Sequence, residues 1–172
     1  MPQTSTKSAI EPDLSGLLAA KGQPNAYLEG LAEAYRATAG WSMLTLLVFD
    51  EKRRVGRRIF TTDPVNYPVS SEKAMAESDW GDRVLKRHEV FVANRPEDFK
   101  PHYIDWEKLV GMGLLSALNY PIVVDSAVLG TVNLMAGSNY YSPPRVEAGR
   151  RLAPLAALGF LLIERSARQG GK

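Results

Sequence analysis

The segment that decides the fold reads GLLSALNYPIVVDSAVLGTVNLM and runs from Gly113 to Met135. Two runs of β-branched and aliphatic residues flank the polar pair Asp125-Ser126, which is typical of a β-hairpin with a short turn. Each predicted strand carries one asparagine, Asn119 or Asn133. With the turn centred near Ser126, the two amides lie opposite or one step diagonal to each other. Because a buried amide needs hydrogen bonds, the pair predicts either a structural cross-link or the polar floor of a ligand pocket.

Composition is that of an ordinary globular protein with one domain. The chain has 172 residues, of which 45% are hydrophobic and 23% charged, so a full core is available. Its 21 Lys and Arg residues nearly balance 19 Asp and Glu residues, which predicts no nucleic-acid partner and no membrane partner. The N-terminus has no apolar signal core, and the longest apolar run, Leu152–Ile163, is too short to span a bilayer. We therefore expect a cytoplasmic protein.

Cysteine is absent from the chain. Its absence excludes disulfides, thiolate nucleophiles and thiolate zinc sites. The two histidines, His88 and His102, are too few for a multi-histidine metal centre. We expect no metal and no cofactor.

Hydrophobic periodicity predicts elements in the order α, β, β, α, β, α, β, β, α. The expected helices cover residues 13–39, 78–87, 105–109 and 142–165, the last kinked at Pro154. The expected strands cover 41–50, 54–62, 90–94 and the two arms of the hairpin. Consecutive hairpins indicate an antiparallel sheet covered by helices, an α+β fold. We expect residues 1–12 to be disordered, residues 13–166 to form the domain, and residues 167–172 to be a frayed tail.

Three pieces of the chain form a recognisable pattern: the strand from Ser116 to Ile122, the segment from Val128 to Leu134, and the terminal helix with Leu152-Ala153. In these pieces the chain resembles GAF domains. A narrower likeness, from Phe60 to Tyr141, is to small stand-alone bacterial GAF proteins of unassigned role. It is carried by Tyr67–Val69, Trp80-Gly81 with Val84-Leu85, Leu118–Pro121 and Gly130–Leu134.

The resemblance implies a GAF-like (PAS/profilin-like) fold. Its antiparallel sheet of about six strands would carry the terminal helices on one face. Loops and short helices would cover a ligand pocket on the other face. The resemblance also implies small-molecule binding and pairing through the terminal helices.

Three activities found in the family depend on residues that this chain does not match. The free methionine-R-sulfoxide reductases need cysteines, and phytochrome-type domains attach their pigment through cysteine, but this chain has none. Cyclic-nucleotide-binding GAF domains carry an Asn-Lys…Phe…Asp-Glu signature. The nearest match here, Asn94-Arg95…Phe99, is not followed by Asp-Glu. We therefore expect neither the reductase activity nor these two ligands.

Polar residues of the hairpin are the first candidate ligand-binding residues, because their amides and hydroxyls would fix a ligand's polar group. They are Ser116, Asn119, Thr131 and Asn133. The alternative for the asparagines is a bond to a neighbouring backbone group or to each other. The alternative for threonine is its ordinary preference for strands.

Aromatic residues with polar tips gather in the segments that would cover the pocket, where they suit a flat or cationic ligand. They are Tyr67, Trp80, Tyr103 and Trp106. Each alone is also a reasonable core residue. Arg83, or alternatively Arg95, would clamp an anionic group, the competing interpretation being a solvated surface residue.

Two further clusters have simpler interpretations. The basic residues Lys52, Arg53, Arg54, Arg57 and Arg58 are interpreted as a solvated hairpin tip or a guarded sheet edge. From Leu152 onward the last helix is apolar on nearly every side, more than one sheet face can bury. This excess predicts a homodimer that pairs through the terminal helices.

Taken together, these features predict a sensor or regulatory GAF domain that binds a small metabolite and acts on a separate partner chain. A first alternative is a cysteine-independent enzyme acting in the same pocket, although its titratable groups form no recognised catalytic spacing. Those groups are Asp79, Asp82, His102, Asp105 and Glu107. A second alternative is a ligand-free dimerisation scaffold whose pocket is filled by its own aromatics.

Overall fold

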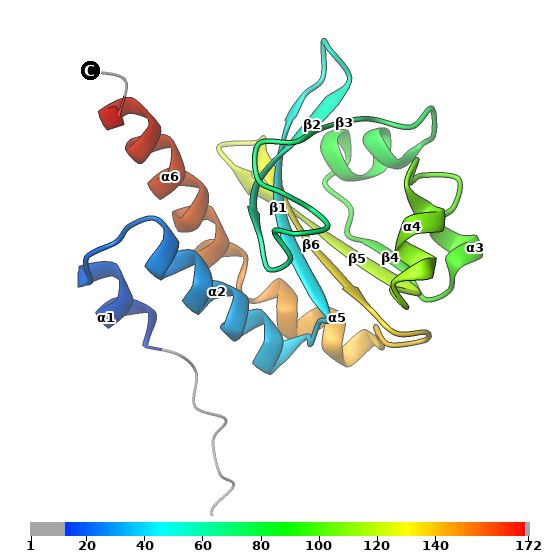
Figure 1. Ribbon diagram of the computed structural model, residues 1–172, viewed down its shortest axis with the longest axis horizontal. Coiled ribbons are helices and arrows are strands. Elements are labelled where there is room, and N and C mark those ends of the chain that lie inside the picture. Colours follow the sequence, from blue (N-terminus) through cyan, green and yellow to red (C-terminus); the bar gives the residue numbers. More distant parts are fainter. Residues whose placement is uncertain (1–12, 171–172) are drawn as a thin grey trace, which may run out of the picture.

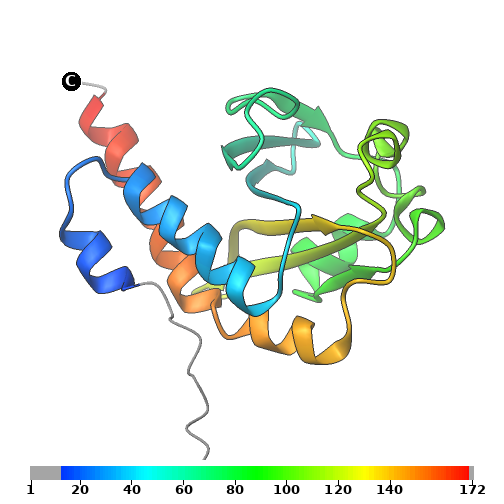
Figure 2. The same ribbon diagram turned by 60° about the horizontal axis from the view of Figure 1, so that its bottom comes forward.

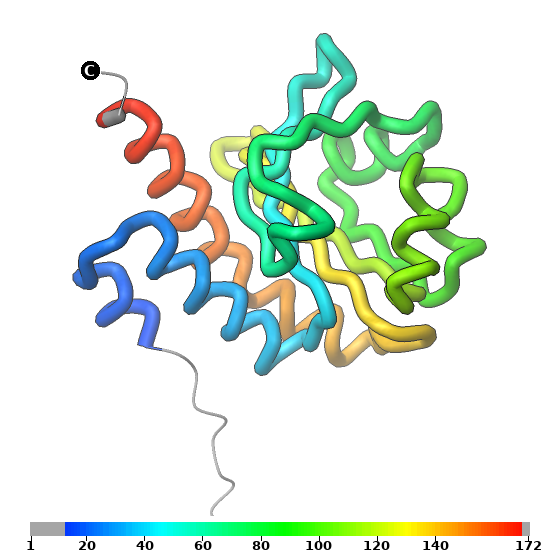
Figure 3. The backbone as a smooth tube through the Cα atoms, viewed as in Figure 1, coloured from blue at the N-terminus to red at the C-terminus, as the bar shows by residue number. Residues whose placement is uncertain are grey.

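A six-stranded antiparallel sheet forms the centre of the protein in a computed structural model that describes residues 13–170. The strands lie in the order β3-β2-β1-β6-β5-β4. They are β1 (Met43–Asp50), β2 (Val55–Thr61), β3 (Glu72–Ala74), β4 (Phe91–Ala93), β5 (Ser116–Val124) and β6 (Ala127–Ala136). β1 lies beside β6 although the two are far apart in sequence, as the tube in Figure 3 shows. The α+β architecture and the antiparallel sheet predicted from the sequence are confirmed.

Helices flank the sheet on both sides (Figures 1 and 2). One side carries the terminal helices, which are α1 (Leu14–Ala19), α2 (Asn25–Thr38), α5 (Pro143–Arg150) and α6 (Ala153–Gly170). The other side carries the short helical segments, which are η1 (Asp82–Lys86), α3 (Pro96–Phe99) and α4 (Trp106–Gly111). Among residues 13–170, no helix combines the length and apolar character that a bilayer-spanning segment requires.

The β5–β6 hairpin closes with the two-residue turn that its sequence predicts. Val124 pairs with Ala127, and both turn residues, Asp125 and Ser126, have positive φ of 50° and 60°. Two consecutive left-handed residues make a type I′ turn, which matches the twist of the flanking strands. Further along, Leu129 has no partner on β5, so the register shifts by one residue.

A second bulge lies in β2. Phe60 pairs with Leu46 and Arg58 pairs with Leu47, so Ile59 has no partner on β1. Side chains alternate between the two faces of a regular strand, so residues 58 and 60 would normally share one face. The extra residue interrupts this alternation and places them on opposite faces. Phe60 therefore packs on the helical side, whereas Arg58 lies on the opposite side of the sheet.

The larger core lies between the sheet and the terminal helices. Alternate residues of the three central strands face it, and they pack against aromatic and aliphatic residues of α2 and α6. The largest buried members include Tyr27, Leu31, Tyr35, Leu44, Leu118, Tyr120 and Leu134. β6 approaches α6 so closely at Gly130 that a Cβ atom there would lie 2.4 Å from the ring of Phe160. Glycine is therefore the residue that fits this crossing.

Several elements differ from the sequence predictions. The expected helix over 13–39 is two helices, α1 and α2, and α3 lies in a segment expected to be a loop. β3 lies in an expected loop, because three residues without apolar alternation give no strand signal; its pairing with β2 makes it the sheet's sixth strand. The expected kinked helix over 142–165 is two helices, because Pro154 lies in the first turn of α6, where proline is tolerated. α6 continues to Gly170, through part of the expected tail. The segment 1–12 lies outside the described residues.

Candidate ligand-binding site

A cavity lies between the sheet and the covering segments on the side opposite the terminal helices. The space free of protein atoms there measures about 760 Å³, part of which is open solvent at the mouth. Much of its wall is apolar and contains three flexible methionines, which adapt to irregular shapes. The apolar and aromatic lining residues are Met43, Leu47, Phe49, Tyr67, Met75, Trp80, Tyr103, Leu109 and Met135. A mostly apolar cavity with a few polar groups is typical of small-molecule sites.

The floor of the cavity is a row of polar side chains that crosses three neighbouring strands. Asn119 on β5 pairs with Asn133 on β6, and Asn133 pairs with Thr45 on β1. All three line the cavity. The bulge at Leu129 produces this alignment, because uninterrupted pairing from the Val124–Ala127 pair would place Asn119 opposite Val132. Of the two arrangements predicted for the asparagines, the directly opposed one is present.

Asn119 is held in one orientation by two donors from the cavity wall. Its Oδ1 accepts a hydrogen bond from Trp80 Nε1 at 2.9 Å and another from the Tyr103 hydroxyl at 2.7 Å. Because the indole N–H only donates, the atom facing Trp80 must be the amide oxygen. Asn119 Nδ2 has no hydrogen-bond partner among residues 13–170. Burial raises the pKa of Tyr103, so its hydroxyl stays protonated.

Asn133 is less firmly held. Its Nδ2 donates to the backbone oxygens of Thr45 and Thr131, each at 3.4 Å, which is long for an N–H···O hydrogen bond. The amide is only partly buried. The floor therefore offers amide groups with unused hydrogen-bonding capacity to a ligand.

Arg58 brings a positive charge to the β2 end of the cavity. Only 6% of the residue is exposed. Its Nη1 donates to the carbonyl oxygen of Pro68 at 3.1 Å and to the Ser71 hydroxyl, whereas its Nε is buried without a partner among residues 13–170. The guanidinium carbon lies 4.8 Å from the centre of the Tyr67 ring. Burial lowers the pKa of Arg58, although arginine stays charged in proteins.

Lys73 and Asp105 form an ion pair in the same region, and both line the cavity. The Lys73 ammonium also lies 5.0 Å from the centre of the Tyr103 ring. Tyr67 has Lys108 Nζ 4.5 Å from its ring centre, and its hydroxyl is buried without a hydrogen-bond partner in the described part of the chain. Burial, followed by the negative charge of Asp105, raises the pKa of Tyr67.

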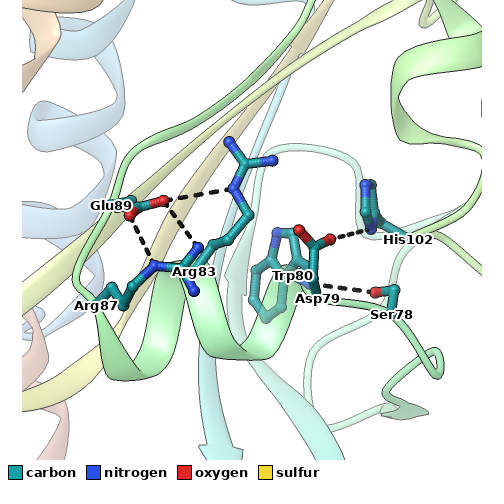
Figure 4. Close-up of polar contacts among 7 residues, drawn as sticks. All are labelled: Ser78, Asp79, Trp80, Arg83, Arg87, Glu89 and His102. Carbon is teal, nitrogen blue, oxygen red and sulfur yellow. Dashed lines mark hydrogen bonds and ion pairs between the residues drawn. The ribbon is translucent and has the colours of Figure 1, made fainter.

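His102 lines the cavity from the loop after α3. Its Nδ1 lies 3.6 Å from Asp79 Oδ1, within ion-pair range but beyond hydrogen-bonding distance. Figure 4 shows the two side chains facing each other. Its ring packs edge-on against Phe91 with centroids 5.2 Å apart. Burial lowers the pKa of His102 below 6.5, more than the charge of Asp79 raises it. The imidazole is therefore neutral at pH 7.

Five of the nine predicted ligand-binding residues line the cavity, namely Tyr67, Trp80, Tyr103, Asn119 and Asn133. The other four, Arg83, Trp106, Ser116 and Thr131, do not. Ser116 lies on the helical side of β5, an odd number of positions from Asn119, and its hydroxyl donates to the Gly137 carbonyl oxygen at 2.6 Å. Thr131 is fully buried on β6, and its hydroxyl has no partner among residues 13–170.

The remaining two predicted residues face other neighbours. The Trp106 ring lies 4.4 Å from Lys100 Nζ. Arg83 pairs with Glu89, which also holds Arg87, on the side of η1 shown in Figure 4. The alternative anion clamp, Arg95, pairs with Asp98 beside α3. Neither of the arginines named from the sequence reaches the cavity.

Arg58 is the arginine that does reach the cavity. The interpretation of the basic cluster as a solvated tip is wrong for this residue, which is buried in the cavity wall. Regular alternation from the core residue Phe60 assigns Arg58 to the helical side, and only the bulge at Ile59 reverses it. Thr45 and Lys73 also line the cavity without having been predicted, the first inside an apolar strand and the second in an expected loop.

The sheet, the helical layer on one face and the covered cavity on the other make this a PAS/profilin-like α+β domain with a ligand-sized cavity. The GAF domain family model matches residues 24–160, and the chain therefore belongs to the GAF family. GAF domains typically serve as small-molecule-binding sensor or regulatory modules. No curated protein matches the chain.

Solved structures share the fold at low sequence identity. The GAF domain of a phosphoenolpyruvate-protein phosphotransferase from Coxiella burnetii has a TM-score of 0.68 and 15% identity, covering 92% of this chain and 93% of that one. A GAF domain/HD domain protein from Geobacter sulfurreducens has a TM-score of 0.63 and 19% identity, covering 88% and 97%. The chromophore-binding domain of a bacteriophytochrome from R. palustris has a TM-score of 0.62 and 15% identity, covering 90% of this chain but only 59% of that one.

Proposed function

We propose that this GAF domain is a sensor or regulatory module that binds a small metabolite in its cavity and acts on a separate partner chain. The observation that carries the proposal is the polar floor. Trp80 and Tyr103 fix the amide of Asn119 within a mostly apolar cavity, yet its Nδ2 group has no protein partner among residues 13–170. A preset polar group in an apolar cavity is what orients a small ligand.

The cavity is open, which favours a ligand-binding role over the alternative of a scaffold filled by its own aromatics. Trp80 and Tyr103 line the cavity and hydrogen-bond to its floor. Phe49 packs against Trp80 with ring centroids 5.4 Å apart. This contact supports the Trp80 ring in addition to its hydrogen bond to Asn119. The aromatics thus form walls around the space that remains.

Native mass spectrometry of the purified protein tests the proposal. We expect a stoichiometric small molecule that is released on unfolding and identified by its mass. An Asn133→Phe variant should lose this molecule, because the ring fills the cavity and only two long hydrogen bonds are removed. A Val92→Phe variant, which adds the same ring at a strand position that is 38% exposed and outside the cavity, should retain it.

A protein that releases no molecule and whose thermal stability is unchanged across a metabolite library would contradict ligand binding. Retention of the molecule by the Asn133→Phe variant would place its site elsewhere. Equal loss from the Val92→Phe variant would point to general instability instead. Circular dichroism of both variants establishes that they are folded before the masses are compared.

We further propose that the domain pairs with a second copy through its terminal helices. Leu161 on α6 is 46% exposed, and its neighbours Leu158 and Leu162 are only partly buried. α6 extends past the sheet edge alongside α2, as Figure 1 shows. Together these residues offer an apolar helix surface of the kind that dimers cover.

Sedimentation velocity tests the pairing. We expect wild-type protein to sediment at twice the mass of one chain and a Leu161→Glu variant to sediment as a monomer, because the carboxylate would be buried unpaired in the interface. Ser166→Glu adds the same charge at an exposed position on the same helix and should leave the dimer intact. A monomeric wild-type protein at micromolar concentration would contradict the proposal.

A further inference from the structure

The charge of Arg58 is not balanced by a partner among residues 13–170. Its neighbours are a carbonyl oxygen, a hydroxyl and an aromatic ring, and no carboxylate of these residues forms an ion pair with it. A buried charge is costly unless it is paired. The exposed Arg53 nearby does have an acidic partner, Glu72. The cavity wall thus holds a guanidinium group that lacks an anion.

The edge of the Arg58 guanidinium that makes no hydrogen bond to the described part of the protein has the geometry that binds a carboxylate. Nη1 is occupied by Pro68 and Ser71, whereas Nε is buried without a partner and Nη2 makes no hydrogen bond to residues 13–170. Nε and Nη2 share one edge of the planar group and donate in parallel, so together they bind both oxygens of a carboxylate. The hydroxyl of Tyr67, whose ring lies against the same guanidinium, forms no well-aligned hydrogen bond in this part of the chain, although the Asp105 carboxylate is near enough to raise its pKa.

The other ionisable groups of the cavity indicate which net charge a ligand would carry. Lys73 is neutralised by Asp105, and His102 is neutral at pH 7. The charged side chains that line the cavity, Arg58, Lys73 and Asp105, therefore sum to one positive charge, and Asp105 acts on Arg58 as well as on Lys73. A carboxylate carries one negative charge and matches it, whereas a phosphate monoester carries about −1.5 to −2 at neutral pH. The charge balance favours a carboxylate.

We propose that the cavity binds a small monocarboxylic acid with an apolar body. The Nε–Nη2 edge of Arg58 and the Tyr67 hydroxyl bind the carboxylate. The apolar body lies between the methionines and Trp80, over the amide floor. This inference rests on the proposed function, since it names the chemical class of that ligand.

Nuclear magnetic resonance of the wild-type protein tests the inference without knowledge of the natural ligand. The probes are phenylacetate, indole-3-acetate and hexanoate, each compared with its primary amide at constant ionic strength. The Nε–H signal of Arg58 reports on the anchor, and the indole N–H signal of Trp80 reports on cavity occupancy. The Arg58→Met and Trp80→Phe variants assign the two signals. We expect a saturable shift of the Arg58 signal with at least one acid and none with its amide.

Affinities measured on two variants of neighbouring arginines give an independent readout. Arg58→Met should weaken binding of the acid by roughly 10- to 100-fold, the effect of losing a hydrogen-bonded charge partner. It should leave binding of the matched amide unchanged. Arg57→Met removes the same charge from an exposed position on the same strand, and should change neither affinity.

The remaining outcomes separate this inference from the proposed function. If the Trp80 signal shifts equally with an acid and its amide while the Arg58 signal does not move, the cavity binds small molecules but Arg58 is not a carboxylate anchor. Tighter binding of phenyl phosphate than of any acid would overturn the carboxylate assignment in favour of a phosphate. If no probe shifts either signal and native mass spectrometry finds no bound molecule, both proposals are overturned.

Discussion

Replacing Asn119 with leucine is expected to lower the free energy of unfolding by about 2–4 kcal/mol, because two donors lose their shared acceptor. Asn119 Oδ1 is the acceptor for both Trp80 Nε1 and the Tyr103 hydroxyl. Leucine has the same branching and the same number of side-chain heavy atoms as asparagine but accepts no hydrogen bond. The residue is 1% exposed, so the apolar side chain itself should be tolerated there. Urea denaturation of the ligand-free protein measures the change.

A double-mutant cycle with Tyr103→Phe separates the lost hydrogen bonds from a general packing defect. Tyr103→Phe removes one donor and keeps the ring, so Asn119→Leu should cost less in that background, by about 1 kcal/mol or more. The reason is that replacing both partners of a hydrogen bond leaves no unsatisfied group. If the costs of the two substitutions simply add, the bond between Asn119 and Tyr103 contributes nothing and the interpretation of the floor is wrong.

Gly130→Ala is expected to destabilise the fold by about 3 kcal/mol or more, because a Cβ atom at this position collides with two elements at once. The added atom would lie 2.3 Å from the backbone oxygen of Leu47 and 2.4 Å from the ring of Phe160. The ring is able to move, but the oxygen belongs to the central strand β1. Relieving that contact requires β1 and β6 to separate locally. Thermal and urea unfolding should both register the loss.

Gly137→Ala is the matched control for this substitution. Gly137 follows β6 and does not have a positive φ, and a Cβ atom added there would meet no other atom within 4 Å among residues 13–170. Its replacement should change the free energy of unfolding by about 0.5 kcal/mol or less. A Gly130→Ala protein as stable as its Gly137→Ala counterpart would show that β6 passes β1 and α6 at a greater distance.

Much of the fold was predictable because its signals are local. The turn at Asp125-Ser126 depends on adjacent residues with φ-permissive side chains, and the helix at the N-terminal end depends on apolar spacing. β3 gave no such signal, because three residues are too few to show a periodic pattern. It is a strand because it pairs with β2, which is distant from local sequence preference. Family resemblance, rather than periodicity, supplied the expectation of a sixth strand.

The cavity was only half predictable from the sequence. Asn119, Asn133 and the aromatics were identifiable because polar residues within apolar strands, and aromatics within loops, stand out against their surroundings. Arg58 was hidden, because a bulge leaves no mark in the order of side chains, and alternation counted from Phe60 gives the wrong face. Ser116 is close to Asn119 in sequence, but it is an odd number of positions away and so points to the opposite face.

The two bulges have a consequence for how the cavity changes in evolution. In an alignment of relatives, Ile59 and Leu129 each count as a one-residue insertion within a strand. A descendant that lost the residue at Ile59 would keep Phe60 opposite Leu46 and Arg58 opposite Leu47, so regular alternation would still direct Arg58 into the cavity. The two bulges are therefore positions where these strands can lose one residue while Arg58 and Asn119 keep facing the cavity.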